Sequence, residues 1–216
     1  GDPLYMDVVE AFAACPCDRK PLVIGGRYGL SSKDTTPAQM LAVFENLKMN
    51  EPKNQFTVGI VDDVTFRSLP VGEEISLAKP GTFEGLFFGL GADGTVGANK
   101  NSIKIIGGTT DKYCQAYFSY DSKKSGGYTS SHLRFGDLPI TSPYLVTTPD
   151  FVACHVPSYV DKYDVLKGLK TGGSFLLNSV HDAETTCATL PDHMKVYLAK
   201  NKINFYIINA TKIAAE

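Results

Sequence analysis

The segment from Phe83 to Gly108 contains the residues whose types and spacing point most directly to ligand chemistry. Its glycines follow the pattern G-x-G-x-x-G in Gly89-Leu90-Gly91-Ala92-Asp93-Gly94, after an apolar run and before apolar residues at helical spacing. In a dinucleotide site, the first glycine makes a tight turn and the second lets the backbone approach a pyrophosphate. The third lets the helix pack on the strand, and the N–H groups that begin the helix face the phosphate.

Two interpretations of this turn are open. It binds a nucleotide-like ligand, or it is a strand-to-helix turn that needs glycine only for close packing. Asp121 stands near the position of the acidic ribose partner of NAD, but Lys123 and Lys124 follow it after a single residue. The candidates at this phosphate turn are Gly89, Gly91, Gly94, Thr95, Asn99 and Lys100.

A second candidate is the loop Arg27-Tyr28-Gly29-Leu30-Ser31-Ser32-Lys33. It combines a guanidinium, an ammonium and two hydroxyl groups with a flexible glycine, which suits a ligand that carries several phosphates. The alternative is a solvated surface loop, and composition alone favours it. The glycine-rich loop 122–127, with its two lysines, could likewise meet phosphate, contact a partner protein or be a solvated turn.

The sequence predicts no catalytic residue and no metal site. No Ser-His-Asp arrangement, paired-carboxylate motif or Walker loop is present. The segment Cys15-Pro16-Cys17 lacks the second cysteine pair that would make a good metal site. Four histidines have neither metal-ligand spacing nor a neighbouring nucleophile, and we interpret them as structural or surface residues: His132, His155, His181 and His193.

Composition excludes several classes of protein. The 216 residues include 21 Lys and Arg and 23 Asp and Glu, so a net charge of −2 gives no indication of nucleic-acid binding. No apolar run approaches the roughly 18 residues of a membrane span, and the start of the chain lacks the pattern of a signal peptide. Five cysteines without framework spacing predict reduced thiols and a cytoplasmic protein. Because the sequence does not begin with Met, we expect a piece of a longer chain.

These candidates need elements to position them, and the pattern divides the chain into 1–81 and 82–216. In the first part we expect a helix over 3–14, strands over 21–26 and 55–61, and between them a helix capped by Thr36. The predicted buried stripe of that helix is Met40, Leu41, Phe44 and Leu47. An extended connector then follows over 62–81.

The second part alternates strands with helices, which predicts an α/β fold. We expect a mostly parallel, Rossmann-like sheet flanked by helices, preceded by the small strand-loop-helix-strand segment and forming one structural unit with it. The expected helices after the glycine turn cover 159–169 and 191–200. The expected strands cover 113–121, 132–136, 143–148, 151–156, 172–179 and 203–210.

Three long stretches resemble a known family. They are GGRYGLSSKDTTPAQMLAVFENL, NQFTVGIVDDVTF, and GLGADGTVGANKNSIKIIG followed by YDSKKSGGYTSSHLRFG. In this order they resemble the central domain of pyruvate:ferredoxin (flavodoxin) oxidoreductases, which is equivalent to the gamma subunit of split 2-oxoacid oxidoreductases. The resemblance extends from Pro21 to the last strand. Asp34 departs from it, since Glu is expected there.

The resemblance implies an enzyme that converts pyruvate and CoA to acetyl-CoA and CO2 and reduces ferredoxin or flavodoxin. It assigns thiamine diphosphate and the iron–sulfur clusters to other domains, and to this one a share of the CoA site and packing against its neighbours. The expected CoA-binding residues are Arg27, Tyr28, Gly29, Ser31, Ser32 and Lys33, with Arg27 and Lys33 on the phosphates. The glycine turn then faces the CoA and thiamine cavity or lies at a domain interface. Two alternatives are a free-standing NAD-binding oxidoreductase domain and a purely structural module.

Overall fold

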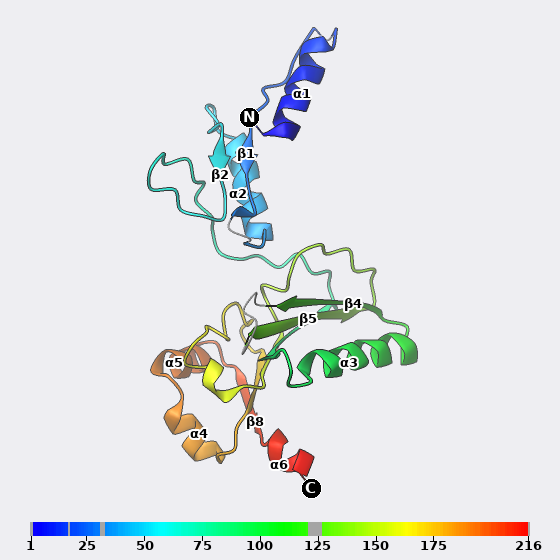
Figure 1. Cartoon of the computed structure of the whole chain (residues 1–216), viewed down its shortest axis with the longest axis vertical. Coiled ribbons are helices and arrows are strands. Elements are labelled where there is room, and N and C mark those ends of the chain that lie inside the picture. The colour runs from blue at the N-terminus through cyan, green and yellow to red at the C-terminus, as the bar shows by residue number, and fades with distance from the viewer. Residues whose placement is uncertain (1, 17, 31–32, 121–126, 216) are drawn as a thin grey trace. The chain divides into compact units, whose positions relative to one another are not determined.

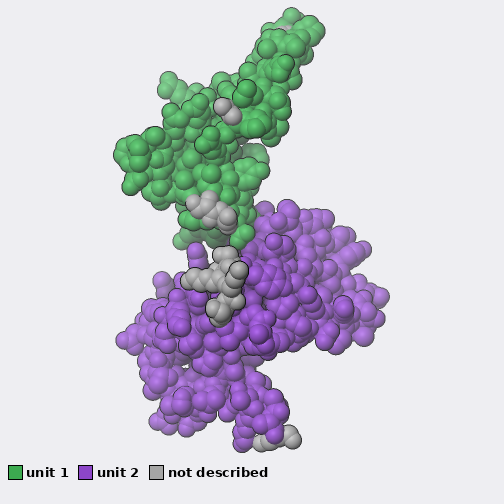
Figure 2. All heavy atoms as spheres, viewed as in Figure 1, with its two compact units in different colours: residues 1–75 green, residues 76–216 purple. Residues whose placement is uncertain are grey.

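The computed structural model describes residues 2–16, 18–30, 33–120 and 127–215. The chain folds into two compact units, Gly1–Ile75 and Ser76–Glu216, which Figure 2 shows in different colours. Among the described residues, no helix has the length and apolar character needed to cross a bilayer.

The first unit is built around one strand-helix-strand arrangement, as predicted. It contains α1 (Pro3–Ala14), β1 (Gly26–Arg27), α2 (Pro37–Leu47) and β2 (Phe56–Thr57). The two strands pair in parallel but are much shorter than the predicted ones. Helix α2 begins as expected, because the Thr36 side chain accepts a hydrogen bond from the Gln39 N–H at 3.4 Å and Pro37 occupies its first turn.

The predicted buried stripe of α2 is wrong. Leu41, Phe44 and Leu47 are 44%, 62% and 50% exposed. The helix instead turns its small residues toward β2, where Ala42 and Val43 pack against a core of Phe56, Val58 and Leu69. Small side chains allow a close approach to so short a sheet, and the larger apolar residues are left outside.

The second unit is a six-stranded sheet in the order β4-β5-β3-β6-β7-β8. Strands β3, β6, β7 and β8 pair in parallel, and β5 lies antiparallel between β3 and β4. The predicted mostly parallel α/β sheet is therefore confirmed. The strands are β3 (Phe83–Leu90), β4 (Tyr113–Tyr120), β5 (Tyr128–Gly136), β6 (Phe151–Cys154), β7 (Ser174–Asn178) and β8 (Asn204–Ile208).

Helices lie on both faces of this sheet, as Figure 1 shows. Helix α3 (Thr95–Thr109) packs on β3, β4 and β5. The other face carries the main core, in which Val152 and Phe175 are fully buried. That core is closed by the 3-10 turn η2 (Pro157–Tyr159), by α4 (Ala183–Thr189) and by α5 (Asp192–Lys200), and α6 (Ala210–Ala215) follows β8.

Two of the predicted elements are absent from the described residues. The segment 143–148 forms no strand, because side chains of the sheet satisfy its backbone: Arg134 donates to the Tyr144 carbonyl and the Val146 N–H donates to His132 Nδ1. Over 159–169 the chain forms turns instead of a helix, which lets Val165, Leu166 and Leu169 reach the core.

The cysteines differ in part from the expected reduced thiols. Cys114, Cys154 and Cys187 are free. Cys15 is disulfide-bonded, so the expectation is wrong for that residue. The prediction came from the number and spacing of the cysteines, and such a count does not decide the state of an individual cysteine. Cys17 lies outside the described residues.

Candidate functional site

The glycine turn connects β3 to α3, and two of its three glycines are explained by local geometry. Gly94 caps the helix with φ +82°, a left-handed conformation that favours glycine. At Gly89 a Cβ atom would lie 2.4 Å from Thr95 Oγ1, so the turn has no room for a side chain. At Gly91 the nearest atom to such a Cβ is Thr129 Cγ2 at 3.8 Å, an ordinary contact. Packing therefore accounts for Gly89 and the left-handed backbone accounts for Gly94, but neither accounts for Gly91.

The carboxylate of Asp93 already occupies the start of α3. It accepts hydrogen bonds from the Leu90 N–H at 2.7 Å and from the Thr95 N–H at 2.9 Å. A negative group at this position satisfies the helix N-terminus in the way that a bound phosphate would. The same charge repels an incoming pyrophosphate, which argues against a dinucleotide in the usual position.

The strand order places the turn at a topological switch point. From β3 the chain crosses to β4 and β5 on one side and later returns to β6 on the other. Ligands of open α/β sheets bind outside the carboxyl ends of the strands at such a point. Here Thr95 Oγ1 and His155 Nδ1 lie 2.7 Å apart and join the turn to the end of β6.

His155 lies at this turn, although the sequence alone was interpreted to give it only a structural or surface role. Burial lowers the pKa of its imidazole, and the charge of Asp93 raises it by a smaller effect. Its carbonyl accepts a hydrogen bond from Asn178 Nδ2 at the end of β7. The available signal was its position directly after the apolar strand residues FVAC, at the carboxyl edge of a parallel sheet.

Asn99 and Lys100, the other candidates of this turn, are consecutive residues of α3 that differ in burial. Asn99 is 4% exposed, and its Nδ2 has no hydrogen-bond partner among the described residues. Lys100 is exposed, and its Nζ lies 5.3 Å from the ring centroid of Phe118 on β4. The ammonium therefore interacts with an aromatic face. Asp121, Lys123 and Lys124 lie outside the described residues.

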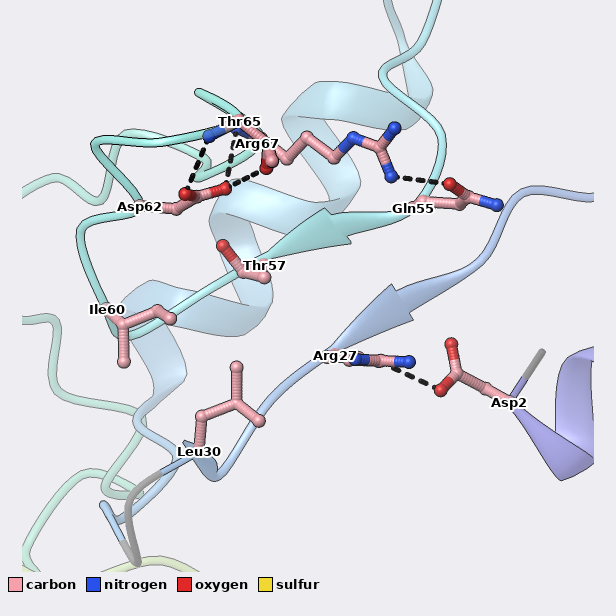
Figure 3. A pocket seen from close by; sticks show the side chains of 9 residues that line it. All are labelled: Asp2, Arg27, Leu30, Gln55, Thr57, Ile60, Asp62, Thr65 and Arg67. Atoms are coloured by element: carbon pink, nitrogen blue, oxygen red, sulfur yellow. Dashed lines mark hydrogen bonds and ion pairs between the residues drawn. The ribbon is translucent and has the colours of Figure 1, made fainter.

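The candidate loop of the first unit borders a pocket of about 440 Å³, seen from close by in Figure 3. Arg27, at the end of β1, donates from Nε to Asp2 Oδ1 at 2.9 Å, and its side chain is 61% exposed. A second guanidinium borders the same pocket, because Arg67 donates from Nη1 to Gln55 Oε1. Leu30 and Ile60 contribute apolar side chains to the lining.

Asp62 also lines this pocket, but its carboxylate accepts hydrogen bonds from residues of its own loop. It accepts the N–H groups of Val64 at 3.1 Å and Thr65 at 2.9 Å, together with the Thr65 hydroxyl. The bonds to Thr65 are the main reason that the pKa of Asp62 lies far below its usual value. The carboxylate thus fixes the loop that carries Arg67, a residue that the sequence interpretation missed because it lies 40 positions from Arg27.

The other described residues of this loop do not all gather around the same pocket. Lys33 lines a second hollow of about 580 Å³ with Gln39 and Gly59. Ile60 lines both hollows, so the two are neighbours. Tyr28 is 68% exposed, and Gly29 has φ +64°, which suits glycine at this bend. Ser31 and Ser32 lie outside the described residues.

Comparison with known proteins connects this chain to one group of enzymes. The family model described as pyruvate ferredoxin/flavodoxin oxidoreductase matches residues 84–216. The pyruvate:ferredoxin oxidoreductase of Moorella thermoacetica is 57% identical over 216 residues, which are 100% of this chain and 18% of that protein. The pyruvate-flavodoxin oxidoreductase of Enterobacter agglomerans is 54% identical over 214 residues, 99% of this chain and 18% of that protein.

A solved structure is also similar to part of the chain. It is the pyruvate oxidoreductase subunit PORC of Thermotoga maritima, with a TM-score of 0.47 and 24% identity over 62% of this chain and 65% of that one. The chain spans less than a fifth of the length of the curated relatives named above.

Proposed function

The chain belongs to the pyruvate ferredoxin/flavodoxin oxidoreductase family, and we propose that it contributes part of the CoA site and packs against sister domains of the full-length enzyme. In this proposal the enzyme oxidises pyruvate with CoA to acetyl-CoA and CO2 in the cytoplasm, and ferredoxin or flavodoxin accepts the electrons. The chain contributes binding surface and no catalytic group.

The pocket that two guanidinium groups border carries the proposal. CoA has a 3′-phosphate and a diphosphate, and Arg binds phosphate oxygens through paired N–H groups. Arg27 at the end of β1 and Arg67 on the loop that Asp62 fixes border one pocket, while Lys33 borders the neighbouring hollow. The proposal therefore gives one phosphate group to the two arginines and the other to Lys33.

The ion pair between Arg27 and Asp2 does not prevent this binding. Both side chains are more than a third exposed, and exposed pairs contribute only about 0–1 kcal/mol. A phosphate with more charge and a better geometry for the guanidinium fork displaces such a carboxylate. The apolar side chains of Leu30 and Ile60 add surface for the less polar parts of CoA.

In this proposal, thiamine diphosphate and the iron–sulfur clusters belong to other parts of the enzyme. Among the described residues, no three His, Cys, Asp or Glu side chains form a group that could hold a metal ion. Cys114, Cys154 and Cys187 lie on β4, β6 and α4 as separate free thiols. The proposal accordingly leaves both cofactors to the rest of the enzyme.

Steady-state kinetics of the full-length oxidoreductase test the CoA assignment. Arg27→Ala should raise the KM for CoA about tenfold, equivalent to roughly 1.4 kcal/mol, because a charge-assisted bond to phosphate is lost. The CoA-independent decarboxylation of pyruvate should stay unchanged. Lys48→Ala removes a cation of the same unit that is paired with Glu45 outside the pocket and serves as the control. An unchanged KM for CoA in Arg27→Ala would contradict the assignment.

A further inference from the structure

One face of the six-stranded sheet is only partly covered. In register across the strands, Phe87 pairs with Ala153, Ala153 with Leu176, and Leu176 with Tyr206. Their side chains therefore share one face, the face on which α3 packs. Helix α3 makes its main contacts with β3, β4 and β5, at one end of the sheet. Among the described residues, no helix packs in a comparable way on the apolar side chains at the β6–β8 end of this face.

Exposure along the last two strands shows the same asymmetry. Burial alternates in β7 and β8, and the residues on the α3 face are the more exposed ones. Tyr206 is 55% exposed and Ile208 is 37% exposed. Their alternate neighbours Phe175 and Phe205 stack with ring centroids 5.4 Å apart on the opposite face, where Phe175 is fully buried.

A parallel sheet is ordinarily buried on both faces. The crossovers of this unit, through η2, α4 and α5, contribute the residues that cover the core face, including Tyr159, Leu190 and Met194. Among the described residues, the segments that join β6, β7 and β8 thus pack on one face of the sheet. A patch that includes Phe87, Phe151, Leu176, Tyr206 and Ile208 remains half-buried or exposed on the other.

We propose that this patch, the β6–β8 face, is the seat of another domain of the same oxidoreductase polypeptide, which covers it with the apolar side of a helix. The length of the relatives supports this occupant, because this chain corresponds to 18% of each and more than four fifths of their length lies outside it. Aromatic and aliphatic side chains without a charged residue among them fit an apolar helix. Asn178 and Asn204 lie on the same face at the strand ends and give the patch a polar rim.

Site-specific photo-crosslinking in the full-length enzyme tests this inference. Benzoylphenylalanine replaces Tyr206 with a side chain of similar character, and the cross-linked peptides are identified by mass spectrometry. The expected result is a cross-link within one polypeptide to a segment outside the 216 residues. Tyr117 is the matched control, because it is 59% exposed and its register partner His132 places it on the opposite face. Benzoylphenylalanine at Tyr117 should not yield the same peptide.

Three outcomes would overturn the inference. They are a cross-link between two polypeptides, which would assign the patch to a second copy, a cross-link to residues 1–75, and no cross-link at all. A second measurement does not depend on the photoreaction. Tyr206→Asp should lower the thermal midpoint of the full-length enzyme by roughly 2–4 °C and leave that of the 216-residue chain unchanged. Equal midpoints for the variant and the wild-type full-length enzyme would also contradict the inference.

The inference rests on the proposed place of the chain in a longer oxidoreductase and does not depend on CoA binding. The two failures can be told apart by measuring the KM for CoA on the same enzyme. A missing cross-link together with the expected Arg27→Ala effect would overturn only the inference about the β6–β8 face. A normal cross-link with no Arg27→Ala effect would overturn only the CoA assignment.

Discussion

At the scale of single residues, CoA binding in the proposed pocket depends on how strongly the neighbouring carboxylates compete with phosphate for the two guanidinium groups. Asp62 is held by hydrogen bonds within its own loop, whereas the Asp2 carboxylate accepts an exposed bond from Arg27. Asp2 is therefore the group with which a phosphate competes.

Removal of that competitor should strengthen CoA binding. In Asp2→Asn the affinity for CoA should rise by roughly two- to fivefold, which corresponds to the contribution of an exposed ion pair. Titration of CoA into the full-length enzyme measures the change. Glu45→Gln removes the same charge from a pair on α2 outside the pocket and should have no effect. Weaker binding in Asp2→Asn would show that the carboxylate orients Arg27 for its ligand.

A buried histidine makes the stability of the second unit depend on pH. Burial, with a further contribution from the charge of Arg134, lowers the pKa of His132 to about 4. Between the ordinary value near 6.5 and about 4, the unfolded chain binds a proton that the folded chain does not. As far as it depends on His132, the free energy of unfolding is therefore highest above about pH 6.5. It falls as the pH drops toward 4, by about 3 kcal/mol in total.

Urea denaturation at pH 7 and pH 4.5 measures this loss. In His132→Asn the difference between the two pH values should be smaller, because the titrating ring is gone while an acceptor for the Val146 N–H remains. His193→Asn changes an exposed histidine and should leave the difference as it is. The same pH dependence in His132→Asn and the wild-type chain would rule out His132 as the cause.

At the scale of elements, the sequence correctly predicted the features that depend on residues close together in the chain. The Thr36 cap, the Pro37 start and the strand-turn-helix at Gly89 are all found, because each depends on neighbours within a few residues. The buried side of α2 could not be predicted, since it depends on how short β1 and β2 are and on what lies beyond them. The irregular segment 143–148 was missed for a related reason. Its backbone partners are His132 and Arg134, which no local pattern connects to it.

The glycine turn provides a stability test at this scale. Gly89→Ala should destabilise the chain by about 1–3 kcal/mol, because the new Cβ would lie 2.4 Å from Thr95 Oγ1. Gly91→Ala should change stability by no more than about 0.5 kcal/mol, because its Cβ would meet only an ordinary contact. Chemical denaturation of the two variants measures the difference. Equal stability of both would refute the packing role that we assign to Gly89.

At the scale of the whole molecule, the alternation of strands and helices predicted the class of fold but not its incompleteness. In the first unit the buried apolar core consists of Phe56, Val58 and Leu69. In the second unit, side chains of the β6–β8 face such as Tyr206 are left exposed by the described residues. Both features are understandable if the chain is part of a longer enzyme, and neither can be read from periodicity within the part. The pocket likewise joins Asp2, Arg27 and Arg67 through the fold, so only Arg27 was a sequence candidate.

Calorimetric titration of CoA into the full-length oxidoreductase tests the central claim most directly, with dephospho-CoA and NAD⁺ as controls. The account predicts that the wild-type enzyme binds CoA more tightly than dephospho-CoA and does not bind NAD⁺ at this site. In the double variant Arg27→Ala with Arg67→Ala, CoA affinity should fall at least about tenfold, since two charge-assisted bonds are lost. Wild-type affinity for CoA in the double variant would show that the phosphates of CoA bind elsewhere.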